Sequence, residues 1–246
     1  MHTHSRTACL AFLTTFVLAG IAAAQTPPPP PKAREAKAEF ALVTTSGNAS
    51  TQSIGAAAQV IFRPPQWVID GQTAFVRNET DEIVRAKSFA ARGRAGRVLT
   101  TRLQAFGQHS YLRDLFSGIV HRNLTEGGLS YALLQGGRNT LFADAGLGYL
   151  KERRTIGVSL STPTAGAGTR YKLQLSENSD ITDDLITSFD LSDEGTWRLQ
   201  HAIALTAKVA APLSLKVSNV LRYVDEPVAG FEQTDTITSA ALVLSF

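Results

Sequence analysis

The feature that most constrains the fold of this chain is a two-residue alternation of apolar and polar side chains over long segments. In residues 197–211, for example, Trp197 and Leu199 share one face, and Arg198 and Gln200 share the other. Successive side chains of a β-strand point to opposite faces, so this period indicates strands with one apolar and one polar face. Beyond the first 37 residues, no segment has the length and 3.6-residue period of a convincing helix.

Turn-forming residues divide the alternating segments into twelve predicted strands. Gly136-Gly137, Ala211-Pro212 and Asp225-Glu226-Pro227 are examples of these turns. The predicted strands cover residues 38–47, 51–62, 66–78, 83–96, 101–112, 117–134, 140–152, 167–177, 182–192, 196–210, 213–224 and 234–246. We expect a long connection at 151–169 and a further one at 225–233. An even number of hairpin-linked strands with no internal domain boundary predicts one antiparallel up-and-down barrel.

Three features favour a barrel that crosses a membrane. Many predicted strands have about 10 residues or more, the length that spans a bilayer at a tilt, whereas globular strands usually have about 5–6. The apolar face is rich in Ala, Gly and Leu, which suits contact with lipid. Aromatic residues near strand ends fit the interfacial girdles of such barrels, and they are Trp67, Tyr111, Tyr149, Tyr171, Trp197, Tyr223 and Phe246. We therefore predict an all-β, antiparallel up-and-down transmembrane β-barrel of about 12 strands.

The N-terminal segment predicts export. Arg6 is followed by an uncharged apolar run at 8–21 and by the small residues Ala22-Ala23-Ala24, which suit a signal peptidase. The run is shorter than the ~20 residues of a membrane-spanning helix. We predict a cleaved signal peptide at 1–24, a Pro-rich periplasmic linker at 25–37 and an outer-membrane β-barrel at 38–246. The single cysteine, Cys9, lies in the predicted signal, so the mature chain has no disulfide or thiolate metal site.

The end of the chain resembles a known bacterial family. The resemblance rests on Pro227, Gly230, Thr234, Asp235, Thr236 and Phe246, and on the segments 46–50, 111–118 and 145–153. The family is named for salt-induced outer-membrane proteins and is formally a domain of unknown function. Its usual Asn-Pro-Pro is replaced here by Asp225-Glu226-Pro227. The resemblance covers about residues 39–246 and implies an outer-membrane barrel of a Gram-negative bacterium, with no catalytic residues.

The final residues also resemble the C-termini of outer-membrane barrels as a class, which end on an aromatic residue preceded by apolar residues at alternate positions. Here the row is Ala240, Leu242, Leu244 and Phe246. The resemblance implies that the barrel assembly machinery recognises this row. We also expect the last strand to pair with the first near Phe40, because closure removes the exposed strand edges that lipid cannot satisfy.

The sequence offers little catalytic or metal-binding chemistry. His109, His121 and His201 are not at ligand spacing, so we predict no metal site and no cofactor. Ser110 follows His109, and Asp114 is near, but adjacent residues of a strand face opposite sides. The net charge of +3, or +2 without Arg6 of the predicted signal, is too small to indicate nucleic-acid binding.

Basic residues on the polar faces form the candidate site. We expect nine in the lumen, namely Arg85, Lys87, Arg102, Arg170, Lys172, Arg198, Lys208, Lys216 and Arg222, against the acids Asp70, Asp144, Asp184 and Asp190. A ring of basic side chains favours anions in a pore. The alternative is that these residues pair with acids and water and merely fill a narrow barrel.

The leading functional hypothesis is an outer-membrane barrel of structural or salt-stress role that passes small solutes, with a leaning toward anions. Its expected partners are outer-membrane lipid and the barrel assembly machinery. One alternative is a membrane-embedded enzyme that modifies lipid, and another is a soluble periplasmic binding barrel, since alternation alone also fits a lipocalin-like fold.

Overall fold

The structure is a computed structural model that describes residues 32–45, 51–192 and 196–246. The predicted signal peptide at 1–24, most of the predicted linker and the family segment at 46–50 lie outside the described residues. Within the described residues no helix is long and apolar enough to cross a membrane.

The described chain forms twelve β-strands and one short 3-10 turn, and the predicted number of strands is confirmed. The elements are β1 (Arg34–Thr45), β2 (Thr51–Phe62), β3 (Trp67–Thr80), β4 (Ile83–Val98), β5 (Leu103–Asp114), η1 (Leu115–Ser117), β6 (Ile119–Gln135), β7 (Asn139–Arg154), β8 (Leu160–Ser176), β9 (Ser179–Asp190), β10 (Trp197–Ala210), β11 (Leu213–Val224) and β12 (Thr234–Ser245).

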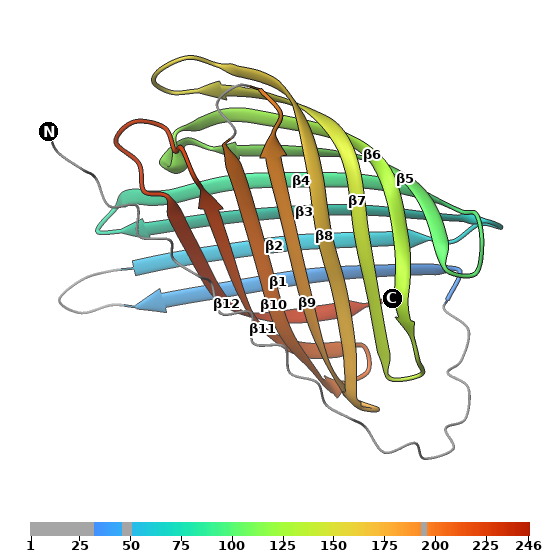
Figure 1. The fold of residues 1–246 in the computed structure, drawn as a ribbon. Helices are drawn as coiled ribbons and strands as arrows, with labels where there is room; N and C mark the ends of the chain where they lie inside the picture. Colours follow the sequence, from blue (N-terminus) through green and yellow to red (C-terminus); the bar gives the residue numbers. More distant parts are fainter. Residues whose placement is uncertain (1–31, 46–50, 193–195) are drawn as a thin grey trace, which may run out of the picture.

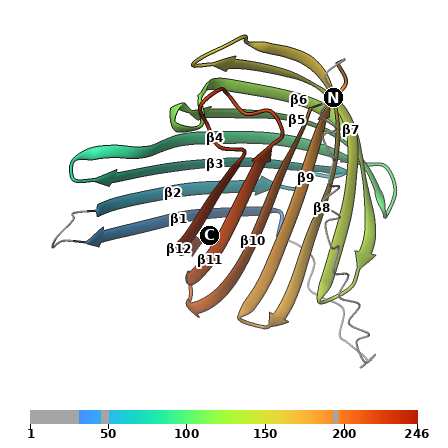
Figure 2. The ribbon, with the colours of Figure 1, turned by 60° about the vertical axis from the view of Figure 1, so that its left-hand side comes forward.

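The strands close into a single barrel in which each strand pairs antiparallel with its sequence neighbours (Figures 1 and 2). β12 completes the ring by pairing with β1, where Phe40 lies opposite Leu242. The predicted closure near Phe40 is therefore confirmed. Main-chain bonds between Ala36 and Phe246, in which each amide donates to the other residue's carbonyl at 3.2 and 2.9 Å, extend this seam to the last residue.

The two ends of the barrel differ in their connections. Connections after even-numbered strands have two to four residues, and we call this the turn end. Connections after odd-numbered strands form the loop end, where the longest is the nine-residue segment 225–233. The first residues of β1 lie at the turn end together with Phe246, because the main chains of Ala36 and Phe246 are bonded there.

The prediction of a long connection at 151–169 is wrong. β7 continues to Arg154, and β8 begins at Leu160, seven residues before its predicted start. The Ser, Thr, Pro and Gly residues of this segment suggest a loop by local preference. In the folded barrel they extend β8, because β7 offers a pairing partner as far as Glu152 opposite Leu160. β1 likewise begins at Arg34, within the predicted linker.

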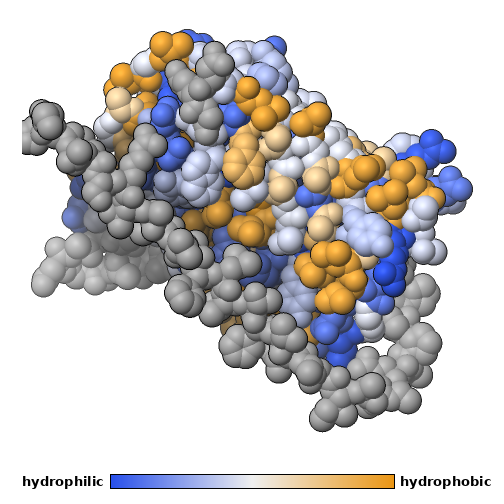
Figure 3. All heavy atoms as spheres, in the orientation of Figure 1, coloured by the Kyte–Doolittle hydropathy of each residue, from blue (hydrophilic) through white to orange (hydrophobic). Residues whose placement is uncertain are grey.

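The register separates an apolar outer face from a polar lumen. Exposed apolar residues such as Phe40, Leu147 and Val217 share one side of their strands, which points outward. Figure 3 shows apolar side chains spread over one view of this surface. The aromatic residues predicted for the interfacial girdles all lie on the outward side of their strands. The lumen side carries the charged residues considered next, together with a few buried apolar ones such as Leu150.

Candidate functional site

Six of the nine predicted basic residues lie on the lumen side of their strands. These are Arg170, Lys172, Arg198, Lys208, Lys216 and Arg222. Arg102 lies in the turn before β5. Arg85 and Lys87 are on the outward side of β4 with the exposed Phe89, so their assignment to the lumen was wrong. β4 carries basic residues on both faces, and only its register with β3 decides which of them point inward.

The lumen has as many acids as bases within the described strands. Its eleven bases include five that sequence reasoning missed, namely Lys37, Arg92, Arg94, Arg122 and Arg154. Its eleven acids are Glu35, Glu39, Asp70, Asp114, Glu126, Asp144, Glu152, Asp180, Asp184, Asp190 and Asp235. The four predicted acids are among them, but the expected excess of positive charge is absent from these strands.

A central network joins the strands β4 to β8 inside the barrel. Arg94 and Arg170 both contact Oδ2 of Asp144, at 2.9 and 3.2 Å. Arg170 also donates to Oγ of the fully buried Ser130 at 3.0 Å. The guanidinium carbon of Arg94 lies 3.7 Å from the ring centroid of Phe106, so the cation is held against an aromatic face. Side chains from five strands therefore meet around one carboxylate.

A second network lies near the loop end. Glu152, with 2% of its surface exposed, forms ion pairs with Arg122 and with Arg154, the latter at 2.8 Å. Arg222 of β11 lies 3.9 Å from Asp114 of β5. In the twelve-strand ring these two strands are six places apart, so this contact crosses the lumen.

The segment 225–233 folds across the same end and we call it the lid. Its Val228 is 4% exposed, and Val228 and Phe231 pack so close to Gly118 that an added Cβ there would lie 2.8 and 2.9 Å from their carbons. Gly118 follows η1, on the other side of the ring from the strands that carry the lid. The turn Asp225 to Glu226 is also anchored, since Nη2 of Arg154 donates to the Glu226 carbonyl at 3.4 Å. The lid therefore narrows the loop-end mouth (Figure 1).

Several arginine nitrogens inside the barrel have no protein partner among the described residues. They are Nη2 of Arg94, Nε and Nη1 of Arg198, and Nε of Arg222. All three arginines face the lumen. Such donors remain available to water or to a polar solute in the lumen.

The structure does not bring His109, Ser110 and Asp114 together as a hydrolytic triad. His109 points outward and bonds to Thr125 at 2.9 Å, whereas Ser110 and Asp114 have the opposite parity and face the lumen. His201 is also on the outer face, 3.0 Å from Asp183. Among the residues that the structure describes, no group of three or more His, Cys, Asp and Glu side chains is placed to hold a metal ion.

Residues 38–246 match the family described as "Protein of unknown function, DUF481". The chain belongs to this family. The DUF481 barrel is also 25% identical over 219 residues to "Uncharacterized protein YdiY" of Escherichia coli K12, with 88% of this chain and 84% of that protein covered.

The structure resembles an outer membrane channel from Pseudomonas putida F1 at a TM-score of 0.53, with 9% identity, 92% of this chain and all of that chain covered. The translocator domain of the autotransporter NalP from Neisseria meningitidis has a TM-score of 0.49 and 11% identity, with 88% of each chain covered.

Proposed function

We propose that this DUF481 barrel is an integral protein of the Gram-negative outer membrane that gives small polar solutes a narrow path. The observation that carries the proposal is a polar, charge-balanced lumen enclosed by a closed wall with an apolar outer face. Backbone groups in a bilayer need internal partners, which a closed ladder supplies. The strands have 12 to 17 residues, more than the roughly 9–11 that a spanning strand requires.

The path is narrow because side chains and the lid cross it. Arg222 approaches Asp114 across the mouth, and the lid rests on Gly118 beside them. Further inside, Arg94 and Asp144 link β4 and β7. A selective filter needs a surplus of one charge, whereas the described strands place equal numbers of acids and bases in the lumen. We therefore expect weak ion selectivity rather than the anion preference suggested by sequence.

The proposal includes the cellular setting. A cleaved signal at 1–24 delivers the chain to the periplasm. The barrel assembly machinery then recognises Ala240, Leu242, Leu244 and Phe246. The loop end faces the outside of the cell, as the longer loops of such barrels do. The fold shared with the Pseudomonas putida channel supports a role in permeation. The salt-related role implied by the family resemblance belongs to the same proposal, and measuring protein abundance at raised osmolarity tests it. No catalytic step is proposed, because His109 and Asp114 lie on opposite faces.

Two measurements test the proposal. Fractionation should give an outer-membrane band whose gel mobility shifts on heating, and a soluble periplasmic band would overturn the membrane assignment. The purified protein should then show small, discrete conductance steps in planar bilayers, with a reversal potential near zero in a KCl gradient. Absence of conductance both in the wild type and in a variant without residues 226–232 would overturn the role as a path for solutes.

A further inference from the structure

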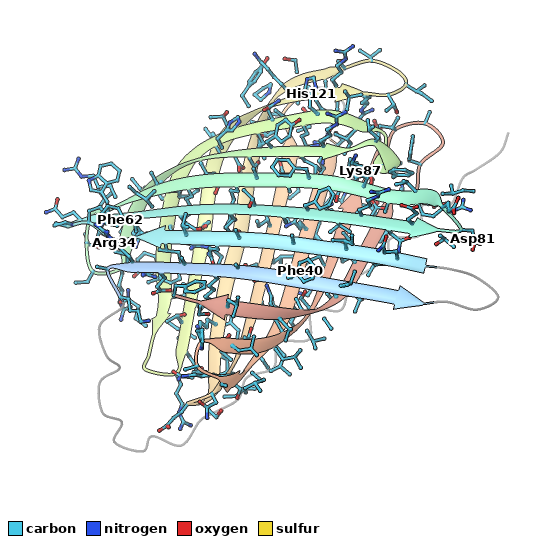
Figure 4. All side chains as sticks on the ribbon, turned by 180° about the vertical axis from the view of Figure 1, so that it is seen from behind. Arg34, Phe40, Phe62, Asp81, Lys87 and His121 are labelled. Carbon is cyan, nitrogen blue, oxygen red and sulfur yellow. The ribbon has the colours of Figure 1, made fainter. Side chains whose placement is uncertain are left out.

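Basic residues gather on the outer face of the barrel at the loop end. Lys87, Arg113, His121, Lys151 and Arg153, here called the outer basic cluster, lie on four consecutive strands, β4 to β7. The register aligns them: His121 is opposite Arg153, and Arg113 is opposite the exposed Phe89. Figure 4 shows Lys87 toward the end of the barrel that carries Asp81, with Arg34 and Phe62 at the opposite end.

The outer basic cluster is not neutralised by the described part of the protein. No ion pair is formed by Lys87, Arg113, Lys151 or Arg153 with any described residue, and all four are exposed. Lys151 lies only over the Tyr149 ring, at 5.9 Å. The outward positions of β5, β6 and β7 carry no acid.

Acids near the cluster belong to the adjoining hairpin of β3 and β4. Glu79 pairs with Arg77 at 2.5 Å, and Asp81 and Glu82 form the turn that follows. Glu79 is therefore already occupied by a base outside the cluster. The surplus positive charge lies farther around the ring, on β5 to β7.

The described outward positions of β8 to β12 carry no charged side chain at the loop end. Outward residues there on β8 to β12 include Ser161, Pro163, Phe189, Trp197, Tyr223 and Thr234. A general need for surface charge would not restrict the bases to one sector. The restriction indicates a localised anionic ligand on the outer surface of β4 to β7.

A shallow apolar groove of about 450 Å³ adjoins the cluster on the outer side of β2 to β5. It arises because Gly71 and Gly93 are directly opposite each other, so no side chain covers the wall between Val60 and His109. Tyr111 lines the part of the groove that is nearest the loop end. Arg113 is two residues farther toward the loop end on β5, a distance of about 7 Å along a strand.

We propose that the outer basic cluster and this groove together bind a phosphorylated lipid of the outer leaflet. The phosphate lies against Arg113, Lys151 and Arg153, whose charged N–H groups form strong hydrogen bonds to phosphate oxygens. An acyl chain occupies the groove beside Gly93. A soluble anion would use the bases alone, whereas the contiguous apolar groove requires an amphiphile. This inference depends on the proposed function, since the loop end has to face the outer leaflet.

The test uses the folded full barrel in detergent, with diphosphorylated lipid A as the probe and native mass spectrometry as the readout. Two variants address the two halves of the site: R113Q/K151Q/R153Q removes charge, and G93L fills the groove. An added Cβ at Gly93 meets no atom within 4 Å, so the leucine of G93L can leave the backbone without a clash at its first atom. Each variant should weaken lipid A binding by about tenfold or more.

Matched controls keep the outcome decisive. R97Q removes an outward base at the turn end, and G107L adds a side chain at an outward glycine that is equally open but does not line the groove. Both should bind lipid A as the wild type does, and excess inorganic phosphate should not displace the lipid. Wild-type binding by either folded variant, G93L or R113Q/K151Q/R153Q, would overturn the lipid site, as would full displacement of the lipid by phosphate. Failure of the outer-membrane proposal is detected separately, by fractionation of cells.

Discussion

The guanidinium of Arg94 lies 2.9 Å from the carboxylate of Asp144, although β4 and β7 are separated in the barrel by β5 and β6. Phe106 of the intervening β5 lies under the guanidinium, with the centroid of its ring 3.7 Å from Cζ. A link between non-adjacent strands braces the curved wall and takes space from the lumen. It therefore connects the stability of the barrel with the width of its path.

We expect Asp144→Asn to destabilise the barrel. The change leaves Arg94 and Arg170 facing each other without their shared carboxylate, and an unpaired group of this kind costs about 1–3 kcal/mol. The measurement is the free energy of unfolding by urea, with the barrel folded in lipid vesicles. Arg97→Gln, on the outward face at the turn end, is the control and should unfold as the wild type does. Equal stability of the D144N variant and the wild type would show that the network adds nothing to the fold.

We expect Gly118→Ala to displace the lid and to increase single-channel conductance. Gly118 has a φ of 75°, which costs other residues about 1–2 kcal/mol, and its new Cβ would meet Val228 and Phe231. Gly157→Ala is the matched control, because Gly157 has a φ of 85° but open space around its Cβ position. A conductance that rises equally in both variants would point to backbone strain rather than to the lid.

We expect removal of Phe246 to impair assembly. The deletion removes an exposed outward aromatic residue and the two main-chain bonds that join Phe246 to Ala36 at the seam. The readout is the fraction of heat-modifiable protein in the outer membrane. Phe246→Tyr keeps the ring and the backbone bonds and should assemble normally. Normal insertion of the truncated chain would argue against the role of this residue as an assembly signal.

We expect His201→Leu alone to destabilise the barrel more than the double variant His201→Leu/Asp183→Asn does. These residues pair at 3.0 Å on the outer face, so loss of His201 alone leaves an acid facing lipid without its partner. An unpartnered group there costs about 1–3 kcal/mol. With Asp183→Asn added, the charge disappears and stability should recover in part. A double-mutant cycle of unfolding in vesicles measures the coupling, and a coupling of zero would contradict the pairing.

Most of the fold follows from patterns that are local in the sequence. The alternation predicted the twelve strands, because a period of two is a property of each strand by itself. The closure of β12 on β1 was expected for a different reason, since an open barrel would leave unpaired strand edges in lipid. The start of β8 was predicted seven residues late, because residues such as Pro163 and Gly166 favour loops locally and only the pairing with β7 makes them a strand.

The candidate site was predicted less well. Arg170, Arg198 and Arg222 were placed correctly in the lumen because they lie on strands with a clear apolar face. Lys87 was wrongly placed in the lumen, and the lumen residue Arg94 was missed, because β4 alternates poorly and carries bases on both sides. The hydrophobic pattern fixes the direction of a side chain only where the opposite face is distinctly apolar.

The sequence alone determined the number of strands, the apolar outer face and the aromatic closing strand, since each depends on the order of residues along one segment. The tertiary structure alone decided that acids balance bases in the lumen, that Arg222 reaches Asp114 across it, and that the lid rests on Gly118. It also brought Arg113, Lys151 and Arg153 together beside the groove at Gly93. These relationships join residues from distant strands, and their geometry is set by register and closure, which no single segment encodes.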